Sequence, residues 1–204
     1  MRSSLIFLTL FALPIFGATL PRKDADGIPG YGVEDLSWEI TLPDDSNVTL
    51  SGTIEQVAEQ LDTLSPTWRA GLDNANAETL EKRTYFDPQD VRCGNFPYLR
   101  NPFRITNGIK YLRGLSGRPA NGPGPGNCGR VSCANTGAIW WCNDTPERKE
   151  LASFGSIADG AQVIVDRCTV RGIDVGVPPS PSVQVAGQAF HPTGWNVIVR
   201  KDSC

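Results

Sequence analysis

The stretch GNCGRVSCANTGAIWWCND, residues 126–144, decides the fold of the later part of the chain. At its middle, Asn135, Thr136 and Gly137 favour a tight turn, and the residues on either side alternate as strand residues do. We therefore expect a β-hairpin with Asn135 and Thr136 in the turn. The expected cross-strand pairs are Cys133 with Ala138, Val131 with Trp140, and Gly129 with Cys142.

Successive strand side chains point to opposite sides of a sheet, so this hairpin has a core face and an opposite face. The expected core face carries Gly129, Val131, Cys133, Ala138, Trp140 and Cys142. The other face carries Arg130, Ser132, Ile139 and Trp141. On this register Trp140 is a core residue and Trp141 is the exposed aromatic, and a one-residue shift in the turn would exchange the two.

The segments around the hairpin predict the rest of the fold. Apolar residues recur at helical spacing over 103–115 and 153–167. Residues 183–190 and 195–200 are typical of strands, whereas the Gly- and Pro-rich segment 117–126 is expected to be a turn-filled connector. The resulting order, αββαββ, predicts an α+β fold: a two-layer sandwich in which a four-stranded antiparallel sheet has both helices on one face.

An earlier segment has its own hairpin and helix. Residues 38–42 and 48–50 read as two strands, and Thr53 can cap a helix with apolar residues at Ile54, Val57, Ala58 and Leu61. This ββα unit buries little apolar surface and is expected to be marginal alone. We interpret it as an intramolecular chaperone or latency segment; the alternative is a small domain retained in the product.

The basic pair Lys82-Arg83 separates the two parts. A kexin-type processing protease recognises two successive cations, although basic residues also favour helix C-termini. All six cysteines follow the pair, and charge divides there too: net −8 over residues 18–83 (13 acidic, 5 basic) and +4 over 84–204 (9 acidic, 13 basic). With an apolar leader ending at Gly17-Ala18, the pattern predicts a signal peptide over 1–18, an acidic pro-segment over 19–83 and a mature domain over 84–204.

Secretion leads to expectations about covalent chemistry. An even number of cysteines in a secreted chain predicts three disulfides. The cysteines are Cys93, Cys128, Cys133, Cys142, Cys168 and Cys204. The alternating direction of the elements favours Cys133 with Cys168, because the end of the second helix is expected near the hairpin turn. The sequons at Asn47 and Asn143 are candidate glycosylation sites.

Several function classes are disfavoured. No Cys-x2-Cys pair is present and His191 is the only histidine, so no metal site is expected, and no motif indicates a cofactor. A net charge of +4 after Arg83 is too small to indicate nucleic acid, and no segment is long enough to span a membrane.

A family resemblance rests on the motifs CGRVSC at 128–133, AIWWCND at 138–144, SIADGA at 156–161 and GQAFHPTGWNVIVR at 187–200, with a final Cys204. This part of the chain looks like small secreted proteins of filamentous fungi. By element order and cysteine placement it also resembles killer-toxin-like and necrosis-associated extracellular effectors. The resemblance implies a two-layer α/β sandwich and a toxin-like or effector role, and it transfers no active-site residue.

The sequence offers two kinds of candidate site. Trp141, Phe190, His191 and Trp195 are candidates for an aromatic binding patch, with Arg130 as a cation beside Trp141. Asp144, Glu147 and Glu150 cluster in sequence as a hydrolase would require, but acids in a polar loop are usually a solvated surface.

The sequence therefore predicts a secreted effector or toxin-like protein, matured by dibasic cleavage, that binds a protein, glycan or lipid on a host or competitor cell surface. The alternatives are a cell-wall carbohydrate-binding module and a small secreted hydrolase. No convincing catalytic constellation is present, so an enzyme is not expected.

Overall fold

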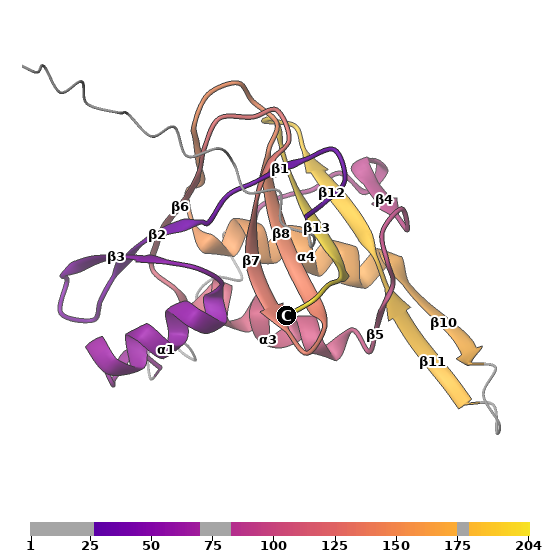
Figure 1. Cartoon of the computed structure of the whole chain (residues 1–204), viewed down its shortest axis with the longest axis horizontal. Coiled ribbons are helices and arrows are strands. Elements are labelled where there is room, and N and C mark those ends of the chain that lie inside the picture. Colours follow the sequence, from indigo (N-terminus) through magenta and orange to yellow (C-terminus); the bar gives the residue numbers. More distant parts are fainter. Residues whose placement is uncertain (1–26, 70–82, 175–179) are drawn as a thin grey trace, which may run out of the picture.

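The computed structural model describes residues 27–69, 83–174 and 180–204 (Figure 1). The predicted leader and Lys82 lie outside the described residues. The helices are α1 (Ile54–Leu64), α3 (Phe103–Gly114) and α4 (Phe154–Cys168), with a 3-10 turn, η2 (Pro88–Asp90). No helix in this described part of the chain is long and apolar enough to cross a membrane.

The main sheet has six strands in the order β1-β7-β8-β13-β12-β4. Their bounds are β1 (Gly32–Val33), β4 (Val91–Cys93), β7 (Asn127–Ala134), β8 (Gly137–Asn143), β12 (Gly187–His191) and β13 (Trp195–Lys201). The central four strands are antiparallel, as expected, and β1 runs parallel to β7. The α+β class is thus confirmed, but the expected single four-stranded sheet was too small. β1 and β4 have two and three residues, too few to show an alternating pattern.

The 126–144 hairpin forms with the predicted turn. Asn135 and Thr136 have φ of 51° and 70°, the left-handed pair that a two-residue hairpin turn requires. Cys133 faces Ala138 as expected, but a bulge between Arg130 and Ser132 shifts the register beyond that point. The observed pairs are Arg130 with Trp140, Gly129 with Trp141 and Cys128 with Cys142.

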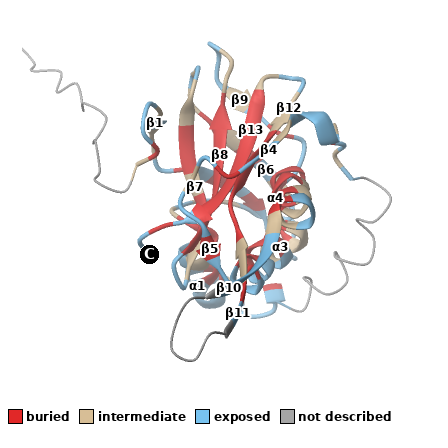
Figure 2. Cartoon of the chain, turned by 90° about the vertical axis from the view of Figure 1, so that its right-hand side faces the viewer, coloured by how far each residue is buried: buried red, intermediate tan, exposed pale blue. Residues whose placement is uncertain are grey.

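The sheet is buried on both faces (Figure 2). The face covered by α3 and α4 carries Ile139, Trp141 and Val197, which belong to the main hydrophobic core. The opposite face carries Ala138, Trp140, Cys142 and Ile198, packed beneath Ile28, Tyr31 and Val33. Trp140 is buried as expected, but beneath residues that precede β7 and not beneath the helices. The expectation that Trp141 is exposed was wrong, because it lies on the face that α3 and α4 cover.

A second sheet joins the parts of the chain before and after Arg83. Its order is β3-β2-β6-β9, formed by β2 (Ser37–Thr41), β3 (Asn47–Ser51), β6 (Gly117–Asn121) and β9 (Lys149–Glu150). The hairpin of β2 and β3 was predicted, but β6 falls in the supposed connector. Gly117 allows this pairing, since a Cβ there would lie 2.1 Å from the carbonyl oxygen of Glu39.

The third sheet, β10-β11-β5, contains β10 (Thr169–Asp174), β11 (Ser180–Val185) and β5 (Leu99–Arg100). The hairpin of β10 and β11 projects from the body of the molecule (Figure 1). The strand expected over 183–190 is divided at Ala186, where the chain passes from this sheet to the main one.

All six cysteines form disulfides, confirming the predicted number. The bonds are Cys93–Cys168, Cys128–Cys142 and Cys133–Cys204. The expected Cys133–Cys168 bond was wrong. Helix α4 ends beside β4 and β12, at the opposite edge of the main sheet from β7, so Cys168 meets Cys93.

Candidate binding surface

None of the chain's five tryptophans presents an exposed ring. Trp38, Trp68, Trp140, Trp141 and Trp195 are each 5% exposed or less. Trp141 is fully buried on the helix-covered face, so the aromatic platform expected there is absent. Flat sugar faces bind best to exposed aromatic rings, and the tryptophans therefore give no support to a carbohydrate-binding platform.

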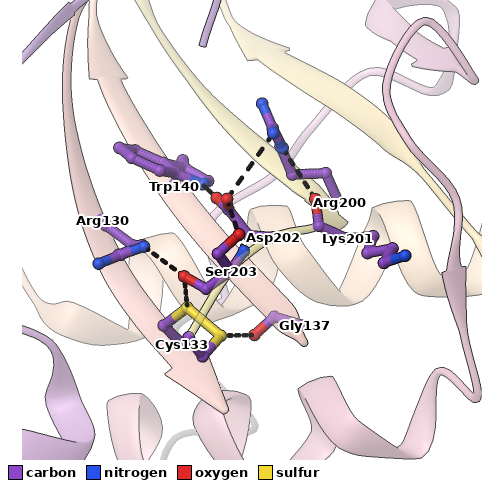
Figure 3. A network of polar contacts seen from close by, with 9 residues as sticks. Arg130, Cys133, Gly137, Trp140, Arg200, Lys201, Asp202 and Ser203 are labelled. Carbon is purple, nitrogen blue, oxygen red and sulfur yellow. Dashed lines mark hydrogen bonds and ion pairs between the residues drawn. A yellow bond between two sulfur atoms is a disulfide. The ribbon is translucent and has the colours of Figure 1, made fainter. Parts of the chain in front are cut away.

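Arg130 contacts Trp140 rather than Trp141 and belongs to a structural network (Figure 3). Its guanidinium lies 5.7 Å from the centre of the Trp140 ring, and Nη1 donates a hydrogen bond of 2.9 Å to the Ser203 carbonyl. Trp140 Nε1 donates to Oδ2 of Asp202 at 2.8 Å. With the Cys133–Cys204 disulfide, these contacts fix residues 202–204 against the hairpin. The Arg130 guanidinium therefore helps to hold residues 202–204 in place.

A cleft of about 430 Å³ lies beside Arg130. Its wall includes Glu34, Asp35, Thr53, Gln56, Arg130 and Trp140. The carboxylate of Glu34 accepts a hydrogen bond from the Gly122 amide, and Arg130 bonds Ser203. Two charged side chains of the cleft, Glu34 and Arg130, are thus already hydrogen-bonded to other residues of the chain.

The other predicted patch residues lie elsewhere. His191 is half-buried and stacks on Trp195 with ring centres 4.8 Å apart, and Phe86 meets both rings edge-on. Trp195 belongs to the helix-side core, whereas Arg130 contacts Trp140 on the other face. Phe190 precedes His191 on β12 and points to the opposite face. Of the residues predicted to form the aromatic patch, the structure therefore brings together only His191 and Trp195. Phe86, which was not predicted, packs against both.

His191 is also electrostatically perturbed. Burial, and secondarily the charge of Lys149, lower the pKa of its imidazole. Nδ1 lies 2.9 Å from the Thr193 hydroxyl, which also accepts a hydrogen bond from Trp195 Nε1. Through its contact with Thr193, the imidazole ring of His191 thus stabilises the turn between β12 and β13.

The candidate hydrolase acids have separate partners. Asp144 accepts a hydrogen bond of 2.7 Å from Asn196, and Glu150 pairs with Arg118 at 3.3 Å. Glu147 is exposed, and its carbonyl binds the Asn143 side chain. Among the described residues, no group of three or more His, Cys, Asp or Glu could hold a metal ion. These contacts favour a structural role for Asp144.

The two sequons differ sharply. Asn47 is exposed in the β2–β3 turn. Asn143 is fully buried, and its Nδ2 donates to the carbonyls of Gly122 at 2.8 Å and Glu147 at 2.6 Å. Its nitrogen is therefore inaccessible in the folded chain.

The projecting β10–β11 hairpin exposes apolar side chains that the sequence did not single out. On one face the cross-strand pairs run from Thr169–Val185 through Arg171–Val183 to Ile173–Pro181. Val185 and the adjoining Leu99 are fully buried, whereas Ile173 is 71% exposed. Hydrophobic surface thus continues outward from the core. No period-two pattern in the sequence marked this strand, because its apolar residues Val170 and Ile173 lie on opposite faces.

Comparison with known proteins identified no relative. No family model matches the chain, and neither the curated proteins nor the solved structures contain a match. Function is therefore argued from the chain's own surfaces.

Proposed function

We propose that this chain is a secreted effector or toxin-like protein that acts by binding a protein on the surface of a host or competitor cell. The observation that carries the proposal is the β10–β11 hairpin, which projects from the body (Figure 1). Its Ile173 side chain is 71% exposed. Exposed apolar side chains lose favourable burial unless a partner covers them. Three disulfides would stabilise such a protein outside the cell.

A protein partner suits this hairpin because β10 is an edge strand. Among the residues that the structure describes, β10 pairs in its sheet with β11 alone, so its other side offers backbone donors and acceptors. An extended partner segment can pair with such an edge, while pockets for alternate side chains supply specificity. Ile173 and the exposed Arg171 would supply apolar and cationic contacts on one face.

Maturation is part of the proposal. A kexin-type protease would cut after Arg83, which is exposed. N-terminal sequencing and intact mass of the protein from culture medium test this step. We expect a chain beginning at Thr84, six hydrogens lighter than its reduced form because of the three disulfides. A single chain beginning near residue 19 would overturn the cleavage.

Binding is tested with labelled protein on intact host and competitor cells. Ile173→Asp should weaken binding by about tenfold or more, since it places a charge in the apolar contact. Val170→Asp is the matched control: Val170 is 48% exposed on the other face of the same strand. We expect this control to keep most of the binding.

Protease and glycosidase treatment of the cells identifies the kind of receptor. Loss of binding after protease treatment alone supports a protein receptor. Loss after glycosidase treatment alone, or binding to protein-free lipid vesicles, would replace the proposed partner by a glycan or a lipid. Absence of binding to either cell type, or equal binding by Ile173→Asp and the unchanged protein, would overturn the proposal.

A further inference from the structure

Thr84, the first residue after the dibasic pair, is anchored to α4 by two hydrogen bonds. Its backbone N–H donates to Oδ2 of Asp159 at 2.7 Å. Its hydroxyl donates to Oγ of Ser156 at 2.9 Å. The nitrogen that cleavage after Arg83 would release therefore already lies in contact with a carboxylate.

The carboxylate of Asp159 is unusually buried for a charged group. Its side chain is only 10% exposed, and burial raises its pKa. Arg113, at the end of α3, places Nη2 3.0 Å from Oδ1, and Thr84 binds Oδ2. A buried charge is most stable when each oxygen has a charged or hydrogen-bonding partner. Here Oδ1 lies against a cation and Oδ2 accepts from a neutral amide, while the more distant charge of Arg83 also favours the carboxylate.

We propose that Asp159 is the receiving site for the new amino terminus at Thr84. This inference rests on the proposed cleavage after Arg83. Hydrolysis breaks the C–N bond between Arg83 and Thr84, and one water molecule is consumed. The carbonyl carbon gains the oxygen and becomes the carboxylate of Arg83, while the nitrogen gains protons and becomes the ammonium group of Thr84. A neutral donor at Oδ2 is thereby replaced by a cation.

The surrounding groups are suited to holding that cation. A hollow of about 290 Å³ at this point is lined by Arg83, Arg113, Asp159 and Asp166 among others. Arg113 disfavours a second cation, but it lies against the other carboxylate oxygen, and Asp159 contacts the nitrogen directly. The Ser156–Thr84 hydrogen bond holds the residue in place. Because Phe86 follows two residues later and packs on Trp195, a fixed terminus also fixes this part of the core.

The test uses the full chain cut in vitro with a dibasic-specific endoprotease, with the start at Thr84 confirmed by sequencing. The pH dependence of α-amino acetylation then reports the pKa of the terminus. A free α-amino group has a pKa of about 7.7–8.0, and a carboxylate in contact favours the charged form. Compared with a peptide of residues 84–90, we expect a pKa about one unit higher and acetylation about tenfold slower at neutral pH.

Two variants of α4 make the test specific. Asp159→Asn should restore acetylation to the rate of the peptide. Asp166→Asn, an exposed residue of the same helix that lines the same hollow, should leave the terminus protected. The comparison of the unchanged protein with the peptide needs no variant, so it stands even if Asp159→Asn does not fold.

The possible outcomes separate the two proposals. Cleavage with a protected terminus supports both. Cleavage with an unprotected terminus overturns the receiving site and leaves the processing intact. If excess protease does not cleave the bond between Arg83 and Thr84, the proposed receiving site is overturned, because no amino terminus forms at Thr84. Secreted protein without a Thr84 start, together with a protected terminus after cleavage in vitro, would overturn natural processing alone.

Discussion

Asn143 stands in a sequon, yet its side chain fixes the loop after β8. Its Oδ1 accepts from the backbone and hydroxyl of Thr145, and its Nδ2 binds two carbonyls. The sequon threonine is thus part of the same closed set of hydrogen bonds. A glycan on Nδ2 would break these bonds and force the fully buried Asn143 side chain out of its place.

We therefore predict that Asn47 is the sequon that carries glycan and that Asn143 stays unmodified. Glycopeptide mapping of protein secreted by a glycosylating host measures both positions. Asn47→Gln should remove the glycan mass, whereas Asn143→Gln should leave it unchanged and lower the free energy of unfolding by about 1–3 kcal/mol. A glycan mapped to Asn143 in folded protein would contradict the prediction.

His191 is predicted to titrate below the ordinary histidine pKa of about 6.5. Burial and Lys149 lower the pKa in the folded protein, so the unfolded chain binds the proton more readily. The contribution of His191 to stability is therefore complete above pH ~6.5 and is lost as pH falls toward the folded pKa. Since it is the only histidine, one imidazole NMR signal gives the folded pKa directly.

Unfolding measurements between about pH 5 and 8 test the energetic side of this prediction. The pH dependence should become shallower in His191→Phe, which keeps an aromatic ring against Trp195. A midpoint at or above 6.5, or an unchanged slope in the variant, would show that burial does not control this group.

The bulge between Arg130 and Ser132 shows where prediction from single residues fails. The turn at Asn135 and Thr136 was predictable because Asn135 suits a left-handed conformation and Gly137 follows it, although the β-branched Thr136 also adopts positive φ. The bulge places Val131 outside the pairing and changes which residues are opposite Trp140 and Trp141. Both tryptophans are buried, so hydrophobicity alone could not assign them to faces.

At the scale of elements, β2 is an integral strand between β3 and β6. Trp38 on this strand is 1% exposed and stacks on Phe154 of α4, with ring centres 5.0 Å apart. Its Nε1 donates to the Gly52 carbonyl at 2.7 Å. The segment before Arg83 thus supplies core residues to the segment after it.

Trp38→Ala is predicted to lower the free energy of unfolding of the intact chain by about 3–5 kcal/mol, because it empties a core position and leaves the Gly52 carbonyl unpaired. Denaturant unfolding measures this loss. Glu39→Ala, an exposed neighbour on the same strand, is the control and should change stability by less than about 0.5 kcal/mol. Similar losses in the two variants would mean that β2 does not pack as the structure shows.

The helices were predictable because α1, α3 and α4 are long enough to show the 3.6-residue period. Their observed bounds lie within one or two residues of the apolar patterns over 103–115 and 153–167. The short strands β1, β4, β5 and β9 have no such pattern, and they depend on partners distant in sequence. For the same reason the Cys93–Cys168 bond was not foreseen: it requires β4 at the edge of the main sheet.

At the scale of the whole molecule, charge and packing both favour association across Arg83. The net charges of −8 over residues 18–83 and +4 over residues 84–204 are complementary. Leu36 fills the space beside Gly129, where a Cβ would lie 2.2 Å from its side chain. Glu55 of α1 accepts hydrogen bonds from the Ser132 hydroxyl at 2.6 Å and the Cys133 amide at 2.9 Å. Release of the segment over residues 19–83 would break these contacts and expose the groups that make them.

We therefore predict that cleavage after Arg83 yields two chains that stay together without a covalent link, since no cysteine precedes Arg83. Native size-exclusion chromatography of the cleaved protein should give one peak containing both fragments, which separate in denaturant. Trp38→Ala should promote dissociation, whereas Glu39→Ala should not. Because Coulomb attraction between exposed charges is screened, salt should weaken the complex only modestly if buried apolar contacts dominate. Spontaneous separation of the unchanged fragments in native buffer would show instead that the first segment is a releasable pro-segment, and that its burial of Trp38 is temporary.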